Sequence, residues 1–163
     1  MKILPVSASL LVIALVGLAP RLGAQAGPSA APTEEPRYFP GPANGAKPRP
    51  YSEAVKIGST LYVSGQLGTL PGASTPVPGG IGPEARQALA NLQAILERHG
   101  SSLDRVAKVT VFLADIKDWP AFNEIYREFF KTNLPARSAL AANGLALGAK
   151  VEVEAIAFVP PSP

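Results

Sequence analysis

The chain has 163 residues, of which 47% are apolar and 17% charged, proportions that suit one globular domain and exclude a largely disordered chain. It contains no Cys, which excludes disulfides, a thiol nucleophile and a lipid-modified cysteine. Its formal net charge is +3, but its Lys and Arg residues form no cluster interleaved with aromatic residues. We therefore expect no nucleic-acid partner.

The first 26 residues have the pattern of a secretion signal. Lys2 precedes an apolar run over residues 3–19, and Ala24 and Ala26 have the spacing that signal peptidase requires. A retained membrane anchor is the alternative, but the run is short for a bilayer and Pro5 interrupts it. We therefore expect residues 1–26 to be a cleaved signal peptide and the protein to be periplasmic or secreted, without a stable membrane anchor.

Residues 27–48 are rich in Pro, Ala and Gly and show no apolar period. This composition predicts a disordered linker. The composition of residues 49–163 is that of one folded domain, large enough for a single core.

Strands are expected over residues 53–58 and 60–66, joined by a turn at Gly58. A loop rich in Gly and Pro then leads to a helix that begins at Pro83 and ends at Gly100. The buried face of this helix is predicted from four apolar residues at helical spacing, namely Ala85, Leu89, Leu92 and Leu96.

Residues 106–113 alternate as a strand does, and Asp118 is placed to cap a second helix that runs to Phe130. Two further strands are expected over residues 137–142 and 150–159. The predicted order is β-β-α-β-α-β-β. The simplest architecture for it is an α+β domain, a mixed sheet with two helices packed on one face.

Few residues outside the last two strands suggest chemistry. The only His, His99, lies at the end of the first helix, where it favours the helix dipole, and the chain has no other residues for a zinc site. Ser64 and Ser138 have no evident His partner, which argues against a serine nucleophile.

Arg137 and two acidic residues are the candidates that remain. A guanidinium can hold a carboxylate with two parallel hydrogen bonds, although Arg137 could equally pair with an acid on a neighbouring strand. Glu152 and Glu154 lie on the face of the last strand opposite its valines. That face could be solvated or could line a pocket, where burial would raise a carboxyl pKa.

The domain resembles the RidA (YjgF) family of enamine/imine deaminases. The most specific matches are Pro-Ala-Arg-Ser at residues 135–138 and Val-Glu-Val-Glu-Ala-Ile-Ala at residues 151–157. Further matching segments cover most of the domain in the same order, at residues 50–55, 62–66, 85–89, 109–113, 122–126 and 129–130.

The resemblance implies a chorismate-mutase-like α+β fold and a homotrimer with sites between subunits. It implies hydrolysis of small carboxylate-bearing 2-imino or 2-enamino acids to 2-keto acids and ammonia, with no metal and no organic cofactor. Arg137 matches the arginine that holds the substrate carboxylate, and Glu152, rather than Glu154, matches the acid that positions water. Other matching positions line the cleft, namely Tyr51, Ser64, Gly65 and Asn123.

Two differences from the family pattern affect what can be transferred. Residues 139–146 lack the valines and the proline of the family, and Asn143-Gly144 predicts an early end of the strand that carries Arg137. A signal peptide also separates the protein from the usual cytoplasmic substrate. Besides an exported deaminase, the sequence therefore leaves open a trimeric carboxylate-binding protein without turnover and a protein-interaction role.

Overall fold

The structure, a computed structural model, describes residues 34–42 and 49–161. The expected signal peptide and most of the expected linker lie outside the described residues. Six strands and two helices follow one another in the order β1 (Arg37–Pro40), β2 (Ser52–Ile57), β3 (Thr60–Leu67), α1 (Ile81–Arg98), β4 (Val106–Leu113), α2 (Trp119–Phe129), β5 (Ala136–Ala141) and β6 (Val151–Phe158).

The strands form one mixed sheet in the order β1-β2-β3-β6-β4-β5. β4 and β5 are parallel and every other neighbouring pair is antiparallel. A parallel pair needs a crossover, and α2 supplies it between β4 and β5. As a result β5, which carries Arg137, lies at an edge of the sheet.

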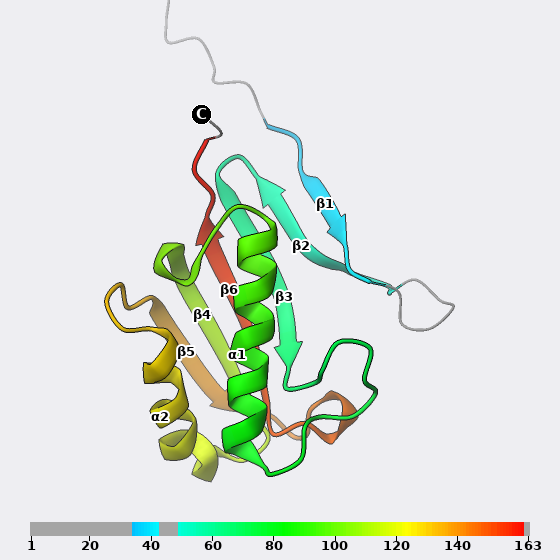
Figure 1. Ribbon diagram of the computed structural model, residues 1–163, viewed down its shortest axis with the longest axis vertical. Coiled ribbons are helices and arrows are strands. Elements are labelled where there is room, and N and C mark those ends of the chain that lie inside the picture. Colours follow the sequence, from blue (N-terminus) through cyan, green and yellow to red (C-terminus); the bar gives the residue numbers. More distant parts are fainter. Residues whose placement is uncertain (1–33, 43–48, 162–163) are drawn as a thin grey trace, which may run out of the picture. The chain divides into compact units, whose positions relative to one another are not determined.

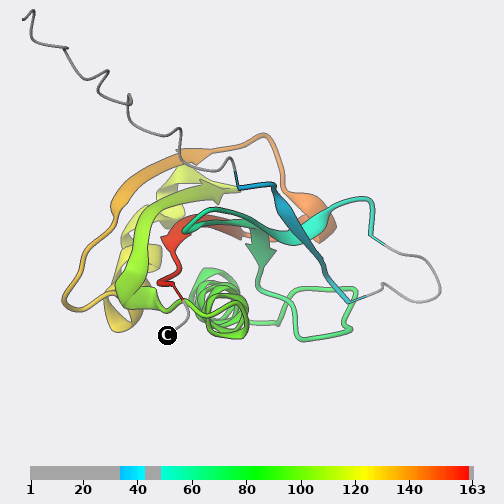
Figure 2. The ribbon, with the colours of Figure 1, turned by 90° about the horizontal axis from the view of Figure 1, so that it is seen from above.

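Both helices cover the same face of the sheet (Figures 1 and 2). The predicted face of α1 is fully buried, in one core with Val109 and Val111 of β4 and Val151 and Val153 of β6. Alternation along each strand leaves the intervening side chains, Glu152 among them, on the other face, which we call the open face. The α+β class with a mixed sheet under two helices is therefore confirmed.

β1 was not expected from the sequence. Residues 37–40 fall within the range predicted to be a disordered linker, but they pair antiparallel with β2, with Tyr38 opposite Val55. The contact that explains the docking is distant in sequence, since the Phe39 ring packs against His99 in a tilted arrangement with ring centroids 4.2 Å apart. Local composition could not indicate a strand held by this partner.

The start of α1 and the capping of α2 also differ from the prediction. α1 begins two residues before Pro83, because Gly80 has a φ of 80° and accepts the first intrahelical hydrogen bond from the Glu84 N–H at 3.1 Å. Pro83 still lies in the first turn, where its missing N–H costs nothing. Asp118 precedes α2 but its side chain caps nothing, because a 3₁₀ turn leads straight into the helix and Asp115 caps that turn instead.

The described residues contain no helix long and apolar enough to cross a membrane.

Candidate functional site

Arg137 leaves the sheet on the side covered by the helices. It pairs in register with Val109, which is fully buried on that side, and paired residues of neighbouring strands share a face. Because β5 is an edge strand that ends at Ala141, the guanidinium lies at the edge of the sheet, beside α2. The predicted turn follows, with Gly144 in a left-handed conformation.

Three aromatic rings of α2 surround the Arg137 guanidinium. Its Cζ lies 4.4 Å from the ring centroid of Tyr126, 5.2 Å from that of Trp119 and 6.0 Å from that of Phe122. Arg137 Nη2 also donates to Asn123 Oδ1 at 2.9 Å. Cation–π contacts and this hydrogen bond fix the orientation of the planar fork.

The aromatic contacts of Arg137 were only partly visible in the sequence. The helix that carries these rings was expected from the sequence, but none of its aromatic residues was connected with Arg137. The signal was nevertheless present, since Trp119, Phe122 and Tyr126 follow one another at spacings of three and four residues and so share one face of a helix.

The Tyr126 side chain, one of the three rings around Arg137, is buried. Burial raises its pKa to about 12, although the positive charge of Arg137 acts in the opposite direction. Its hydroxyl has no hydrogen-bond partner among the described residues. Tyr126 therefore stays neutral at working pH and contacts Arg137 through its ring.

Glu152 lies on the open face, packed against Gly65. An ideal Cβ built on Gly65 would lie 2.8 Å from Glu152 Cδ, so only glycine leaves room for this carboxylate. Burial raises the pKa of Glu152, and the negative charge of Glu154 raises it further. A carboxyl held in this way takes up and releases a proton nearer neutrality than an exposed one.

Glu154 occupies a different environment on the same face. It lines a small hollow of about 140 Å³ together with Tyr62, Lys108 and Thr110. Lys108 Nζ in turn donates to the Ser138 hydroxyl at 2.6 Å. Of the two acids, Glu152 is therefore the one in contact with Gly65.

Ser64 and Tyr51 lie near Gly65. The Ser64 hydroxyl donates to the backbone oxygen of Ser52 at 2.7 Å. Tyr51 directly precedes β2 and its side chain is half exposed, with Arg49 Cζ 5.9 Å from its ring centroid. These residues and Glu152 form one group, which we call the glutamate half-site.

One chain does not bring Arg137 and Glu152 together. Arg137 and Asn123, which we call the arginine half-site, lie on the helix side of β5. Glu152 lies on the open face of β6, and β4 runs between these strands. The six predicted site residues thus fall into two half-sites, and Arg137 and Glu152 lie on opposite faces of the sheet.

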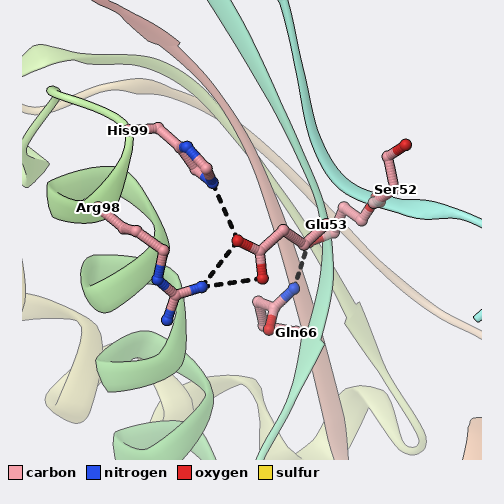
Figure 3. A network of polar contacts seen from close by, with 6 residues as sticks. Ser52, Glu53, Gln66, Arg98 and His99 are labelled. Carbon is pink, nitrogen blue, oxygen red and sulfur yellow. Dashed lines mark hydrogen bonds and ion pairs between the residues drawn. The ribbon is translucent and has the colours of Figure 1, made fainter. Parts of the chain in front are cut away.

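A further polar cluster joins β2 to the end of α1 (Figure 3). The buried Glu53 carboxylate accepts from Arg98 Nη1 at 2.7 and 2.9 Å and contacts His99 Nε2 at 2.9 Å. Burial raises the pKa of Glu53, but hydrogen bonds and charges from Arg98 and His99 outweigh it and hold that pKa below its ordinary value. His99 does end α1 as expected, and its ring additionally binds Glu53.

Within the described ranges, no group of three or more His, Asp or Glu side chains is arranged to hold a metal ion.

Comparison with known proteins gives consistent results. The model of the family described as Endoribonuclease L-PSP matches residues 44–159. The human 2-iminobutanoate/2-iminopropanoate deaminase is 46% identical over 112 residues, which are 69% of this chain and 82% of that protein. The rat protein of the same name is 49% identical over 111 residues, which are 68% of this chain and 81% of the rat protein.

Solved structures agree with these sequence matches. RidA from an Antarctic Psychrobacter bacterium has a TM-score of 0.66 and 35% identity, covering 78% of this chain and 98% of its own. The yeast protein YEO7 has a TM-score of 0.70 and 39% identity, covering 77% of this chain and all of its own (100%).

Proposed function

Because this chain belongs to the RidA (YjgF) family, whose model carries the description Endoribonuclease L-PSP, we propose that it is an imine deaminase. It hydrolyses small 2-imino or 2-enamino acids to 2-keto acids and ammonia. The observation that carries the proposal is the Arg137 guanidinium, oriented by three aromatic rings and Asn123 at an open edge of the sheet.

Arg137 binds the substrate carboxylate. A planar fork that is already oriented matches the two carboxylate oxygens and loses little freedom when they bind. The carboxylate then fixes the position of the neighbouring C=N carbon. Positioning of this kind can supply most of the acceleration that a reactive imine needs.

Glu152 accepts and donates the protons that move during the reaction. Water adds to the imine carbon, forming a C–O bond while a proton reaches the nitrogen. The resulting carbinolamine loses ammonia as the C–N bond breaks and the C=O bond forms. A carboxyl whose pKa is raised by burial can accept a proton from water and return it to nitrogen within one cycle. This chemistry needs neither a metal nor an organic cofactor, and activity should survive a chelator.

The complete site forms between subunits of a homotrimer. The positions of the two half-sites on opposite faces of one sheet support this, because a neighbouring copy could bring its glutamate half-site to the arginine half-site. The open face also exposes large apolar side chains that an interface would cover, among them Tyr62, Leu140 and Phe158, each about half exposed. Sedimentation of the full chain measures the oligomeric state, and a monomer would contradict this part of the proposal.

The deaminase acts outside the cytoplasm. The secretion signal over residues 1–26 supports this location, which implies an imine that arises outside the cell or in the periplasm. Fractionation of cells followed by N-terminal sequencing tests it. A protein that keeps Met1 and stays in the cytoplasm would contradict export.

Clearance of an imine made in situ tests the activity. An amino-acid oxidase generates 2-iminopropanoate from alanine, and semicarbazide traps whatever imine remains. We expect the wild type to accelerate imine loss and Arg137→Ala to lose at least about tenfold of that acceleration, with Arg137→Lys recovering only part of it. Arg127→Ala removes an exposed arginine of α2 and is the matched control.

Failure of the wild type to accelerate the loss of several imino acids would contradict a deaminase. If the trimer still bound small carboxylates, a binding protein without turnover would be the better description. Equal acceleration by Arg137→Ala would show that the carboxylate anchor is wrong.

A further inference from the structure

A cavity of about 610 Å³ lies on the helix side of the sheet, away from the arginine half-site. Its walls come from the start of β2, the end of β3, the outer face of α1 and the loop over residues 68–80. Arg137, Asn123 and Glu152 are not among its lining residues. The volume is that of a site for a small organic molecule.

One end of this cavity is positively charged. Arg49 and Arg98 both line it, and Glu53 is the one acidic residue among the lining side chains. The Glu53 carboxylate already pairs with Arg98 and His99 (Figure 3). Both hydrogen bonds from Arg98 to Glu53 come from Nη1, and half of the Arg98 side chain is exposed.

Arg49 adds a second guanidinium at this end. Within the described part of the chain it forms no ion pair, and its Cζ lies over the ring of Tyr51. Two guanidiniums beside one neutralised carboxylate attract an anion, and their planar forks suit a carboxylate or a phosphate.

The rest of the cavity is apolar. Leu70 and Leu147 line it although each is more than half exposed, and the buried Ile95 of α1 lines it too. Leu147 has a φ of 58°, a left-handed conformation that is strained for leucine. The strained backbone at Leu147 thus lies at the wall of this cavity.

Hydrogen bonds already hold the loop over residues 68–80, which forms one wall of the cavity. Asn91 Nδ2 donates to the backbone oxygens of Leu67 at 3.0 Å and Thr69 at 2.8 Å. Gln87 Nε2 in turn donates to Asn91 Oδ1 at 2.9 Å. A bridge between Thr69 and Pro76 closes the loop. A ligand would therefore bind without having to order this wall.

We propose that this cavity is a second binding site, for an organic anion with a carboxylate or phosphate head and an apolar body. Arg49 and Arg98 bind the head, and Leu70, Ile95 and Leu147 contact the body. Tyr51 and Gly65 also border the cavity, so the second site adjoins the glutamate half-site. The proposal does not depend on deaminase activity.

Calorimetric titration of the full chain tests the second site, with hexanoate and hexyl phosphate as probes and hexan-1-ol as the uncharged comparison. We expect one or both anions to bind saturably and hexan-1-ol to bind at least about tenfold more weakly. Arg49→Ala should weaken anion binding by a similar factor. Arg86→Ala is the control, because Arg86 pairs with Glu128 on the surface of the helices, outside this cavity.

Three results would overturn the proposal. One is the absence of saturable binding by either anion, and another is an unchanged affinity in an Arg49→Ala variant that unfolds at the wild-type temperature. The third is loss of binding in Arg137→Ala, which would place the probe in the deaminase site. Because no imine is present in the titration, a protein without deaminase activity leaves this test intact.

Discussion

At Gly65 the backbone lies directly against the Glu152 carboxylate, the proposed catalytic group. A methyl group there would occupy the space of the Glu152 carboxylate, which is the end of a flexible side chain and can move away. We therefore expect Gly65→Ala to fold but to lower kcat for imine hydrolysis by roughly 10- to 100-fold, since displacement of a reacting group by about 1 Å has effects of that size.

Thermal unfolding and steady-state kinetics of the same preparation separate the two effects. Gly82→Ala, at a glycine with nothing within 4 Å of the new methyl, is the matched control and should keep its activity. Wild-type kcat in Gly65→Ala would mean that the position of the Glu152 carboxylate does not matter.

The pair of acids on β6 predicts a pH effect. Burial and then the charge of Glu154 raise the pKa of Glu152, so the carboxylate form appears only at a higher pH than for an exposed Glu. If that form activates water, activity rises with pH through the raised pKa. Removing the negative charge in Glu154→Gln lowers this pKa, and the acid limb of kcat/KM should move to lower pH.

The acid limb of the kcat/KM profile is measured as the enzyme-dependent rate above the uncatalysed hydrolysis at each pH. Glu97→Gln, an exposed acid of α1, is the control and should leave the limb in place. A shift to higher pH in Glu154→Gln would contradict the assignment of Glu152 as the base.

Arg137, Glu152 and Glu154 were candidates from the residues alone, but their roles, and the choice of Glu152 over Glu154, came only from the resemblance to a family. The spacing of Glu152 and Glu154 places both on one face, and nothing local distinguishes them. The contact with Gly65, 87 positions away, makes the difference in the structure. The pairing of Glu53 with His99 is equally non-local, at a separation of 46 residues.

At the scale of elements, the packing of the β3–α1 loop against the first turn of α1 depends on Gly68. A Cβ on Gly68 would lie 2.6 Å from Glu84 Cα and 2.9 Å from its carbonyl carbon, and helix backbone cannot move aside cheaply. We expect Gly68→Ala to lower the free energy of unfolding by about 1–3 kcal/mol, the usual cost of overpacking.

Urea unfolding measures this difference, with Gly82→Ala again as the control. A methyl on Gly82 meets nothing and replaces glycine within a helix, so that variant should be equal to or up to about 1 kcal/mol more stable than the wild type. A stability of Gly68→Ala equal to that of Gly82→Ala would show that the loop does not pack as described.

The elements with strong periodicity were the predictable ones. Residues 106–113 alternate cleanly and form β4 with those bounds, because its inward valines meet a continuous core. β1 could not be predicted, since its four residues are held by β2 and by the contact between Phe39 and His99. The start of α1 was shifted because backbone geometry at Gly80 decides it, whereas α2 begins directly after Asp118, as predicted.

At the scale of the molecule, the arginine and glutamate half-sites face away from each other across one sheet. Their separation follows from two elementary facts, the alternation of side chains along strands and the crossover that places β5 at the edge. The proposed mechanism, which uses both half-sites, therefore needs a second copy of the chain. Export of that assembly stays a prediction from residues 1–26.

Mixed refolding of two inactive variants tests this requirement most directly. Arg137→Ala lacks the arginine half-site and Glu152→Gln lacks the glutamate half-site, so each alone should be inactive. If neighbouring subunits complete each site, equal amounts unfolded and refolded together should recover about a quarter of wild-type imine hydrolysis, since random cyclic trimers then contain that fraction of intact sites. A refolded mixture no more active than its two components, although it forms trimers, would contradict a site shared between subunits.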